Sequence, residues 1–413
     1  MKRVSILLTA ACAAALLMSA GAHASPACDQ MKRWLVNGGG GASGLLVVDA
    51  ETGKTVCASG ANRPLPLASN MKMFTTATAL SKFGPDHRIP TKVFRDGKVD
   101  ARGVLHGSLY LQGGGDPALG TPAFDAGYLG GLGTNILSLR PQIRAAGIKS
   151  ITGRLYADDS VFDRLRGVAD SGYATSYYIG PLSGLSFNAG FAGNSSSSGF
   201  SSDPAKAAAR KLVGSLRNGG IQMPSGVALG VTPANADRVA MIESAPLTEL
   251  VDLTNIYSNN FFAETLIKLL GAEAGKGGTT SSGAAVVEGF AQSLGSTVHA
   301  VDGSGLTRSN RAAPREVIDL LLGMRKQEVG DVFIQDLPLT GAEGTVDDRM
   351  HSTAANRRCR VKTGTLTGVS NLSGYCFNKS GKVMAFSILM GSVGSLSLAH
   401  LRQDQIAGLV AGF

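Results

Sequence analysis

The sequence predicts an α+β protein, in which an antiparallel sheet covered by helices is interrupted by a large strand-rich insertion. A strand hairpin and a helix come early in the chain, and a helix with a three-strand meander comes late. Between them, from about residue 93 to 245, short strand-like stretches such as GSLYLQGGG alternate with glycine-rich loops. We therefore expect residues 25–92 and 246–413 to form one discontinuous domain, with residues 93–245 inserted into it.

The first 24 residues have the pattern of a secretory signal peptide. Lys2 and Arg3 give a basic start, an apolar run follows, and the small-residue sequence AHA ends the segment at residue 24. Cys12 lies inside the apolar run and would leave with it. No later stretch approaches the roughly 20 apolar residues that a transmembrane helix needs. We expect a secreted, periplasmic protein with at most peripheral membrane contact.

Four cysteines remain after signal removal: Cys28, Cys57, Cys359 and Cys376. An even number in an exported chain indicates two disulfides formed in an oxidising compartment, with buried free thiols as the alternative. Three connectivities are possible. We expect Cys28 to pair with Cys57 and Cys359 with Cys376, because the second pair flanks a predicted hairpin and can bridge neighbouring strands.

The charge pattern limits the partners. Basic residues outnumber acidic ones by 39 to 30, a formal net charge of +9, which favours anionic surfaces such as a cell wall. Aromatic and basic residues do not interleave in the way that nucleic-acid grooves use, so we expect no nucleic-acid partner. The histidines are scattered and show no H-E-x-x-H or paired Cys-His spacing. We expect no metal and no cofactor.

The early elements follow in order along the chain. Residues 45–48 (LLVV) and 55–58 (TVCA) flank the turn DAETG and predict a hairpin. A helix should follow within SNMKMFTTATAL, where Met73, Ala77 and Leu80 recur at i, i+4 and i+7, so that one face packs inward. Inside the insertion, the polar stretch AGNSSSSGFSSDP predicts a loop near residues 190–203.

The late elements return to the first sheet. Helical spacing reappears in TNIYSNNFFAETLIKLLGAEAG. The tail RRCRVKTGTLTGVSNLSGYCFNKSGKVMAFSILMG predicts three successive strands separated by Gly-containing turns. Together with the early hairpin, these strands would close into one sheet.

Three short motifs carry the candidate chemistry. Ser69 and Lys72 form the only S-x-x-K in the chain, and residues 362–364 form the only K-T-G. The middle motif, S-x-N, has two candidates, at residues 258–260 and 186–188, and we favour 258–260 because it precedes a helix that should rejoin the sheet. Ser69 alone would equally fit a helix N-cap. The order of the three motifs is what indicates catalysis.

The first two motifs supply a nucleophile and proton carriers. A serine hydroxyl is a weak nucleophile at neutral pH and needs a base within reach. Lys72 lies one helical turn after Ser69, and apolar surroundings together with a second cation, Lys362, would lower its pKa. Ser258 could then relay a proton to a leaving amine, and Asn260 could hold both Lys72 and a substrate amide.

The third motif suits an extended substrate that ends in a carboxylate. Gly364 lets another backbone approach closely, so a peptide can add along the strand edge. Lys362 and Thr363 would face the carboxylate. The helix start at Ser69 offers a backbone N–H and a favourable dipole to an oxyanion.

These motifs, with the stretches LYLQGGGDPAL, PLSGLSFNAGF, DGSGLTRSN and VKTGTLTGVSNLSGY, resemble the type-4 penicillin-binding proteins. These are class C low-molecular-mass enzymes, serine D-alanyl-D-alanine carboxypeptidases and endopeptidases of bacterial peptidoglycan. The resemblance runs from about residue 40 to the end of the chain. It implies a penicillin-binding transpeptidase or β-lactamase-like fold, peptidoglycan stem peptides as substrates, and β-lactam antibiotics as covalent ligands.

The resemblance also implies roles for individual residues. Ser69 would be acylated, Lys72 would be its general base, and the backbone N–H groups of Ser69 and Thr365 would form the oxyanion hole. Asp158 of the insertion would bind the free amino end of a substrate side chain, although its neighbour Asp159 competes for that role. Arg308 would lie near the cleft, with a surface salt bridge as the alternative. The second motif would be Ser258 and Asn260, and the carboxylate-binding strand Lys362, Thr363 and Gly364.

The leading hypothesis is therefore an exported DD-peptidase that removes terminal D-alanine or cuts D-Ala to diaminopimelate cross-links. A β-lactamase would share the chemistry, but the large insertion between the first and second motifs argues against the compact lactamase layout. A peptidoglycan-binding or sensor protein without turnover is the alternative from another class. Intact motif residues argue against it.

Overall fold

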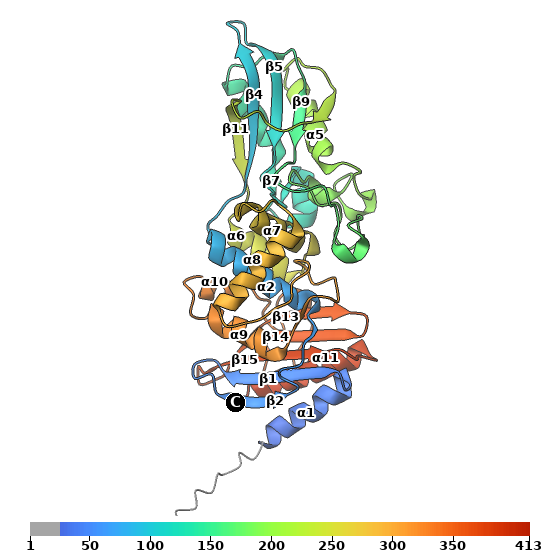
Figure 1. Ribbon diagram of the computed structural model, residues 1–413, viewed down its shortest axis with the longest axis vertical. Coiled ribbons are helices and arrows are strands. Elements are labelled where there is room, and N and C mark those ends of the chain that lie inside the picture. The colour runs from blue at the N-terminus through green and yellow to red at the C-terminus, as the bar shows by residue number, and fades with distance from the viewer. Residues whose placement is uncertain (1–24) are drawn as a thin grey trace, which may run out of the picture.

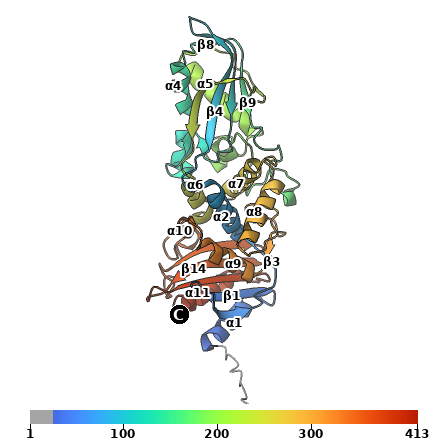
Figure 2. The ribbon, with the colours of Figure 1, turned by 60° about the vertical axis from the view of Figure 1, so that its left-hand side comes forward.

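The computed structural model describes residues 25–413. The predicted signal peptide, residues 1–24, lies outside the described residues. The molecule is elongated, with one sheet toward each end and a layer of helices between them (Figures 1 and 2). The first and last segments of the described chain lie together at one end, and residues from the middle of the chain form the other end.

The terminal sheet, formed by the first and last parts of the chain, has five strands in the order β13-β14-β15-β1-β2, and all neighbouring strands are antiparallel. The expected hairpin is β1 and β2, the expected meander is β13 to β15, and the pairing of β1 with β15 joins them. The first and last parts of the chain therefore share one sheet. Its strands are β1 (Ser43–Asp49), β2 (Thr55–Ser59), β13 (Cys359–Leu366), β14 (Val369–Phe377) and β15 (Val383–Met390).

Helices cover both faces of the terminal sheet. On one face, α1 and α11 bury Met31, Leu35 and Ile406 against strand residues such as Phe386. On the other face lie α2 and α9, with α6, α7, α8 and α10 beside them. The helices are α1 (Pro26–Gly39), α2 (Met71–Phe83), α6 (Leu247–Ile256), α7 (Asn260–Glu273), α8 (Thr280–Ser293), α9 (Pro314–Met324), α10 (Gly330–Gln335) and α11 (Leu396–Val410).

Helix α2 is more deeply buried than its sequence predicts. The spacing indicated one inward face, yet every residue from Met71 to Leu80 is buried. The reason is its central position, because α6, α7, α8 and α10 all contact it. The buried threonine hydroxyls of α2 form hydrogen bonds to backbone carbonyls; Thr78, for example, donates to the carbonyl of Phe74 at 2.7 Å.

The inserted sheet has the order β10-β9-β5-β4-β11, with β8 also paired to β5. It begins at Pro90 and ends at Glu243, close to the expected boundaries at 93 and 245. Helices α4 and α5 pack on it and enclose a separate apolar core. Its elements are β4 (Pro90–Val99), β5 (Val104–Gln112), α4 (Leu139–Ala145), β8 (Ser150–Ile151), β9 (Leu155–Asp158), α5 (Pro204–Asn218), β10 (Val227–Leu229) and β11 (Asp237–Glu243).

Short elements complete the chain. Two-residue strands pair as β3 (Leu65–Pro66) with β12 (Arg311–Ala312) and as β6 (Leu119–Gly120) with β7 (Thr134–Asn135). A short helix, α3, spans Pro122–Phe124. Residues 159–203, which include the expected loop, contain only 3₁₀ turns and irregular backbone, with Phe191 bridged to Phe200.

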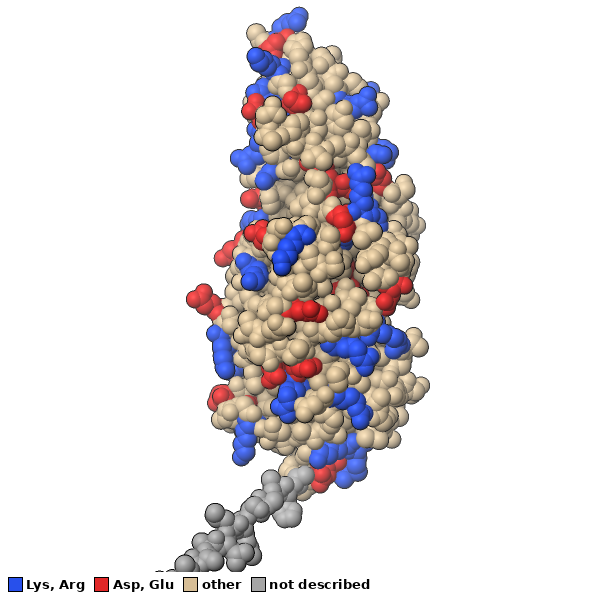
Figure 3. All heavy atoms as spheres, viewed as in Figure 1, with Lys and Arg blue, Asp and Glu red and all other residues tan. Residues whose placement is uncertain are grey.

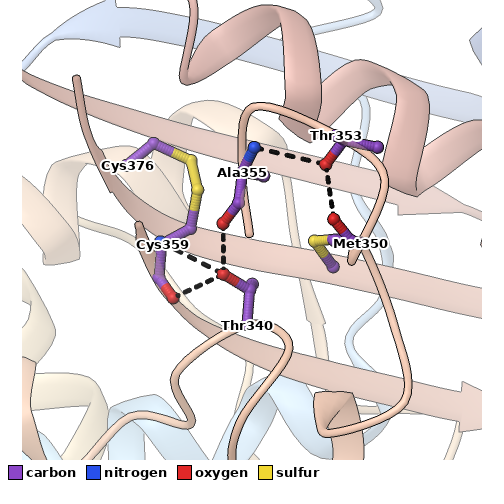
Figure 4. The surroundings of a disulfide bond; sticks show 6 residues. All are labelled: Thr340, Met350, Thr353, Ala355, Cys359 and Cys376. Carbon is purple, nitrogen blue, oxygen red and sulfur yellow. Dashed lines mark hydrogen bonds between the residues drawn. A yellow bond between two sulfur atoms is a disulfide. The ribbon is translucent and has the colours of Figure 1, made fainter. Parts of the chain in front are cut away.

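Both expected disulfides are present. Cys28–Cys57 ties α1 to β2. Cys359–Cys376 joins directly opposite residues of β13 and β14, with 4.0 Å between their Cα atoms. Figure 4 shows Thr340 beside the second bridge, donating its hydroxyl to the carbonyl of Ala355 at 2.5 Å and accepting from the N–H of Cys359 at 3.2 Å. This contact anchors the loop that precedes β13.

The surface shows no single charged region on the side seen in Figure 3. There, Lys and Arg side chains are interspersed with Asp and Glu. Among the helices of residues 25–413, none is both long and apolar enough to cross a membrane.

Candidate active site

Ser69 lies in a tight turn that leads into the buried helix. A 3₁₀ turn, η1 (Ala68–Asn70), precedes α2, so Ser69 and Lys72 lie one turn apart at its start. Ala68 adopts a left-handed backbone with φ of 44°, which is costly for a residue with a side chain. Gly305 packs against this turn so closely that a Cβ there would lie 1.8 Å from the carbonyl oxygen of Ala68.

Lys72 is held by three partners. Its side chain is fully buried, and Nζ lies 3.0 Å from Ser69 Oγ, 2.7 Å from Asn260 Oδ1 and 2.7 Å from the carbonyl oxygen of Ser304. The amide oxygen and the carbonyl can only accept hydrogen bonds. A neutral amine that donates to both of them keeps its lone pair for the hydroxyl proton of Ser69. The geometry therefore suits a general base.

The charge state of the site supports the same role. Burial lowers the pKa of Lys72 to about 7, although the carboxyls of Glu264 and Asp302 oppose that change. Burial also lowers the pKa of Lys362 well below its usual value, and the charge of Lys72 adds to the effect. Two buried ammonium groups repel each other, so near-neutral pH leaves an unprotonated amine available.

The S-x-N motif at residues 258–260 meets both lysines. Lys362 Nζ donates to Ser258 Oγ at 3.0 Å, and Asn260 accepts from Lys72. Ser258 has a φ of 55°, and the side chain of Asn259 caps α7 by accepting from the N–H of Phe262. This turn directs the side chains of Ser258 and Asn260 toward the lysines.

The competing motif at residues 186–188 has a structural role. Asn188 is buried in the inserted domain. Its side chain accepts from the N–H of Thr121 at 3.0 Å and donates to the carbonyl of Gly193 at 2.8 Å. The choice of residues 258–260 therefore agrees with the geometry.

Strand β13 lies directly against η1. A Cβ on Gly364 would lie 3.1 Å from the backbone nitrogens of both Ser69 and Asn70 and 2.9 Å from the carbonyl oxygen of Leu67. Two buried amides fix this approach. Asn70 donates to the carbonyl of Lys362 at 2.9 Å, and Asn371 of β14 donates to the carbonyl of Leu67 at 2.7 Å.

These residues surround a cleft of about 500 Å³. Ser69, Ser258, Asn260 and residues 363–365 line it, whereas Lys72 and Lys362 are buried behind its wall. The cleft follows the edge of β13, the last strand of the terminal sheet. Residues 338–340 pair with the first part of this edge, through Cys359, Arg360 and Val361, and residues 363–366 line the cleft beyond them. An extended peptide can therefore lie beside the nucleophile. Further lining residues are Tyr178, Gly305, Leu306, Thr345, Arg349, Leu366, Thr367 and His400.

The sequence analysis did not predict several of these lining residues, among them Arg349 and His400, whose side chains are ionisable. Arg349 is bound to Asp404 at 2.6 Å, and burial and the Arg349 charge lower the pKa of His400. They come from a loop and from α11, far apart in the sequence and without a recognisable motif. Tyr178 was missed for the same reason, because its segment reads only as loop.

Of the two residues whose roles rest on the resemblance alone, Arg308 lies at the edge of the cleft and Asp158 lies away from it. Arg308 is exposed and donates to the carbonyl of Thr367, at the edge of the cleft. Asp158 does not line this cleft. It is 1% exposed at the end of β9, accepts from the N–H groups of Thr232 and Ser160 at 2.8 and 3.1 Å, and borders a different cavity. The backbone of the insertion occupies its acceptor oxygens.

The sequence matches a known protein family. Residues 35–199 and 191–412 match the D-Ala-D-Ala carboxypeptidase 3 (S13) family. The chain is 30% identical over 456 residues to a D-alanyl-D-alanine carboxypeptidase of Actinomadura sp. (strain R39), covering 91% of this chain and 82% of that protein.

Solved structures show the same fold. Penicillin binding protein 4 from Haemophilus influenzae has a TM-score of 0.77 and 21% identity, over 94% of this chain and 99% of that one. It has also been solved with a β-lactam. A predatory endopeptidase from Bdellovibrio bacteriovorus has a TM-score of 0.57 and 20% identity, over 89% and 92% of the two chains. The chain belongs to the D-Ala-D-Ala carboxypeptidase 3 (S13) family, as a serine DD-carboxypeptidase of the type-4 penicillin-binding group.

Proposed function

We propose that this enzyme acts outside the cytoplasm on peptidoglycan stem peptides through an acyl-enzyme on Ser69. Ser69 Oγ attacks the carbonyl carbon of the penultimate D-alanine while its proton passes to Lys72. The C–N bond then breaks, and terminal D-alanine leaves after taking a proton by way of Ser258. Water hydrolyses the ester and regenerates the serine.

One observation carries the proposal: Lys72 Nζ lies within hydrogen-bond reach of Ser69 Oγ, with two acceptors fixing its other protons. The edge of β13 gives the peptide its place, and Thr363, which lines the cleft, would hold its carboxylate, with Lys362 buried behind the wall. The backbone N–H groups of Ser69 and Thr365 would hold the oxyanion. The same machinery would cut D-Ala to diaminopimelate cross-links, as the likeness to a predatory endopeptidase supports.

A β-lactam would acylate Ser69 in place of the peptide, because its strained amide presents the same carbonyl and carboxylate. The test is the intact mass of the mature protein after incubation with benzylpenicillin, beside Ser69→Ala. We expect a single lasting adduct that the mutant lacks, together with release of D-alanine from a D-Ala-D-Ala peptide. Ser186→Ala, in the competing motif, is the matched control and should still be acylated.

Two other outcomes would each indicate one of the alternative functions. Penicillin that is consumed without a lasting adduct would indicate a β-lactamase. Peptide that binds without release of D-alanine, and without any adduct, would indicate a binding or sensor protein. Either result would overturn the proposed peptidase.

A further inference from the structure

A second cavity, of about 340 Å³, adjoins the catalytic cleft and is rich in tyrosine. The exposed large apolar side chains of residues 25–413 include four aromatic ones, and all four line this cavity. Surface hydrophobic residues scattered singly need no explanation, but a cluster in one hollow marks a binding surface. We call it the tyrosine pocket. Its exposed tyrosines are Tyr128 (40%), Tyr177 (81%), Tyr178 (69%) and Tyr257 (67%).

The tyrosine pocket has an ordered aromatic base. Tyr128 stacks on Phe124 with ring centroids 5.0 Å apart and meets Phe191 edge-on at 5.6 Å. Phe191 in turn stacks on Phe200. Phe124, Phe191 and Phe261 are buried, so these rings are part of the fold. Exposed rings on such a base offer contact area at a low cost in conformational entropy.

The tyrosine pocket is continuous with the catalytic cleft. Tyr178 and Asn260 line both cavities. Asn260 Nδ2 donates to the carbonyl of Tyr178 at 3.0 Å, while its Oδ1 accepts from Lys72. One amide therefore joins the aromatic segment of the insertion to the general base. A long substrate that occupies the cleft can extend into the pocket.

The lining excludes most ionic ligands. It contains no Lys, Arg, Asp, Glu or His side chain, only aromatic and aliphatic groups with two asparagines. A free amine or carboxylate would find no counter-ion there, and leaving it unpaired in an apolar site is unfavourable. The suitable ligand is neutral, has flat apolar faces for the rings, and carries hydroxyls or amides for tyrosine hydroxyls and asparagine side chains.

We propose that the tyrosine pocket binds the glycan strand of peptidoglycan, a chain of N-acetylated hexosamines. The C–H face of a pyranose ring is apolar and packs on an aromatic face, while its hydroxyls and N-acetyl groups hydrogen-bond. With its lactyl groups amide-linked to stem peptides, the strand is neutral. The stem peptide instead carries ionised groups. This inference rests on the proposed function only in taking peptidoglycan as the substrate.

Direct binding tests the pocket without catalysis. The probe is the neutral N-acetylglucosamine tetramer, titrated by calorimetry into the full mature chain carrying Ser69→Ala. Adding Tyr177→Ala and Tyr257→Ala should weaken binding at least tenfold, whereas the conservative pair Tyr177→Phe and Tyr257→Phe should retain most of it. The matched control is Val231→Ala, an equally exposed apolar residue outside the pocket, which should have no effect.

Steady-state kinetics distinguish whether the glycan or the stem peptide occupies the tyrosine pocket. The kcat/KM of the enzyme for a disaccharide-bearing pentapeptide is divided by that for the free pentapeptide, and the two Ala substitutions should lower this ratio at least tenfold. An equal loss on both substrates would assign the pocket to the stem peptide and overturn the glycan proposal. So would a tetramer that does not bind. If the tetramer binds through the tyrosines but the enzyme with Ser69 intact releases no D-alanine, the glycan-binding proposal stands and the proposed peptidase activity is wrong.

Discussion

At the scale of single residues, the chemistry depends on how the protein sets the charge of Lys72. Burial raises the pKa of Glu264 to about 8, so this carboxyl is mostly neutral when Lys72 titrates near 7. Burial raises the pKa of Asp302 too, but the N–H groups of Gly305 and Thr307, which donate to it at 2.7 and 2.9 Å, oppose that rise. Glu264 and Asp302 both hold the pKa of Lys72 up. Asp302 accepts more hydrogen bonds than Glu264 does, so we expect it to supply more of the negative charge near pH 7.

This reasoning predicts a pH shift in Asp302→Asn. Acylation requires neutral Lys72, so its rate should rise with pH through a midpoint near 7 in the native enzyme. Removing the nearby negative charge favours the neutral amine and should move that midpoint lower, by on the order of one pH unit. The measurement is the rate of acylation by benzylpenicillin from pH 5 to 9.

Glu264→Gln is the matched control, because it removes a carboxyl that is mostly uncharged below pH 8. Its midpoint should move less than that of Asp302→Asn. A merely structural loss would lower the rate at every pH and leave the midpoint in place. A larger shift in Glu264→Gln would show that Glu264 is the ionised partner.

The sequence predicts this candidate site because three short motifs occur in a fixed order along the chain. Ser69, Lys72, Ser258, Asn260 and Lys362 come together in space as that order indicated. Asp302 and Glu264 could not be assigned in the same way, because their role depends on burial and on contacts between distant segments.

At the scale of elements, the site is made by the approach of β13 to η1. The meander was predictable from alternating strands and turns, but its contact with η1 was not, since it depends on sequence separations near 300 residues. Asn70 and Asn371 make that contact through backbone carbonyls, and Gly364 allows it by having no side chain.

Gly364→Ala should therefore impair acylation more than it impairs folding. The added methyl group would lie 2.9 Å from the carbonyl of Leu67, so β13 must move away from Ser69 by a few tenths of an ångström. Misplacement near the reacting atoms should lower the acylation rate by on the order of 10²-fold. Acylation rates and melting temperatures, measured together, check this.

Gly214→Ala offers the comparison. This glycine lies inside α5 of the inserted domain, and a Cβ there would meet nothing within 4 Å. The substitution should leave acylation unchanged and stabilise the fold by about 0.5–1 kcal/mol. Equal acylation rates in both variants would show that the close approach at Gly364 does not shape the site.

At the scale of the whole molecule, the insertion is connected to the rest of the protein at the two places where the chain enters and leaves it, and it also packs against α7. Backbone hydrogen bonds join these two chain crossings: the N–H of Leu247 donates to the carbonyl of His87 at 2.8 Å, and that of Ser244 to the carbonyl of Ile89 at 3.0 Å. The change to short strand-like stretches and glycine-rich loops predicts an insertion from about residue 93 to 245. It could not predict how the insertion packs against α7, because that depends on one ion pair and on side chains from the irregular segment.

That ion pair joins Lys268 of α7 to Asp163 of the insertion, with Nζ 2.5 Å from Oδ1. Lys268 has a fully buried side chain, whereas that of Asp163 is 22% exposed. Removing the carboxylate leaves the charge of Lys268 buried without a counter-ion. Removing the lysine leaves a carboxylate whose Oδ2 is buried, but whose side chain is partly exposed and whose Oδ1 still accepts from the N–H of Leu165 at 3.0 Å. Asp163→Asn should therefore lower the free energy of unfolding by about 3–5 kcal/mol, and Lys268→Met by less.

The double variant should lie above Asp163→Asn in stability, because methionine at position 268 no longer needs a counter-ion. Asp237→Asn, which breaks an exposed pair with Arg95, should cost less than about 1 kcal/mol. Urea unfolding of the four variants measures these differences. Equal losses from the two single substitutions would contradict the asymmetry. If Asp163→Asn cost no more than Asp237→Asn, this pair would not hold the insertion to the catalytic domain, and the crossings would suffice.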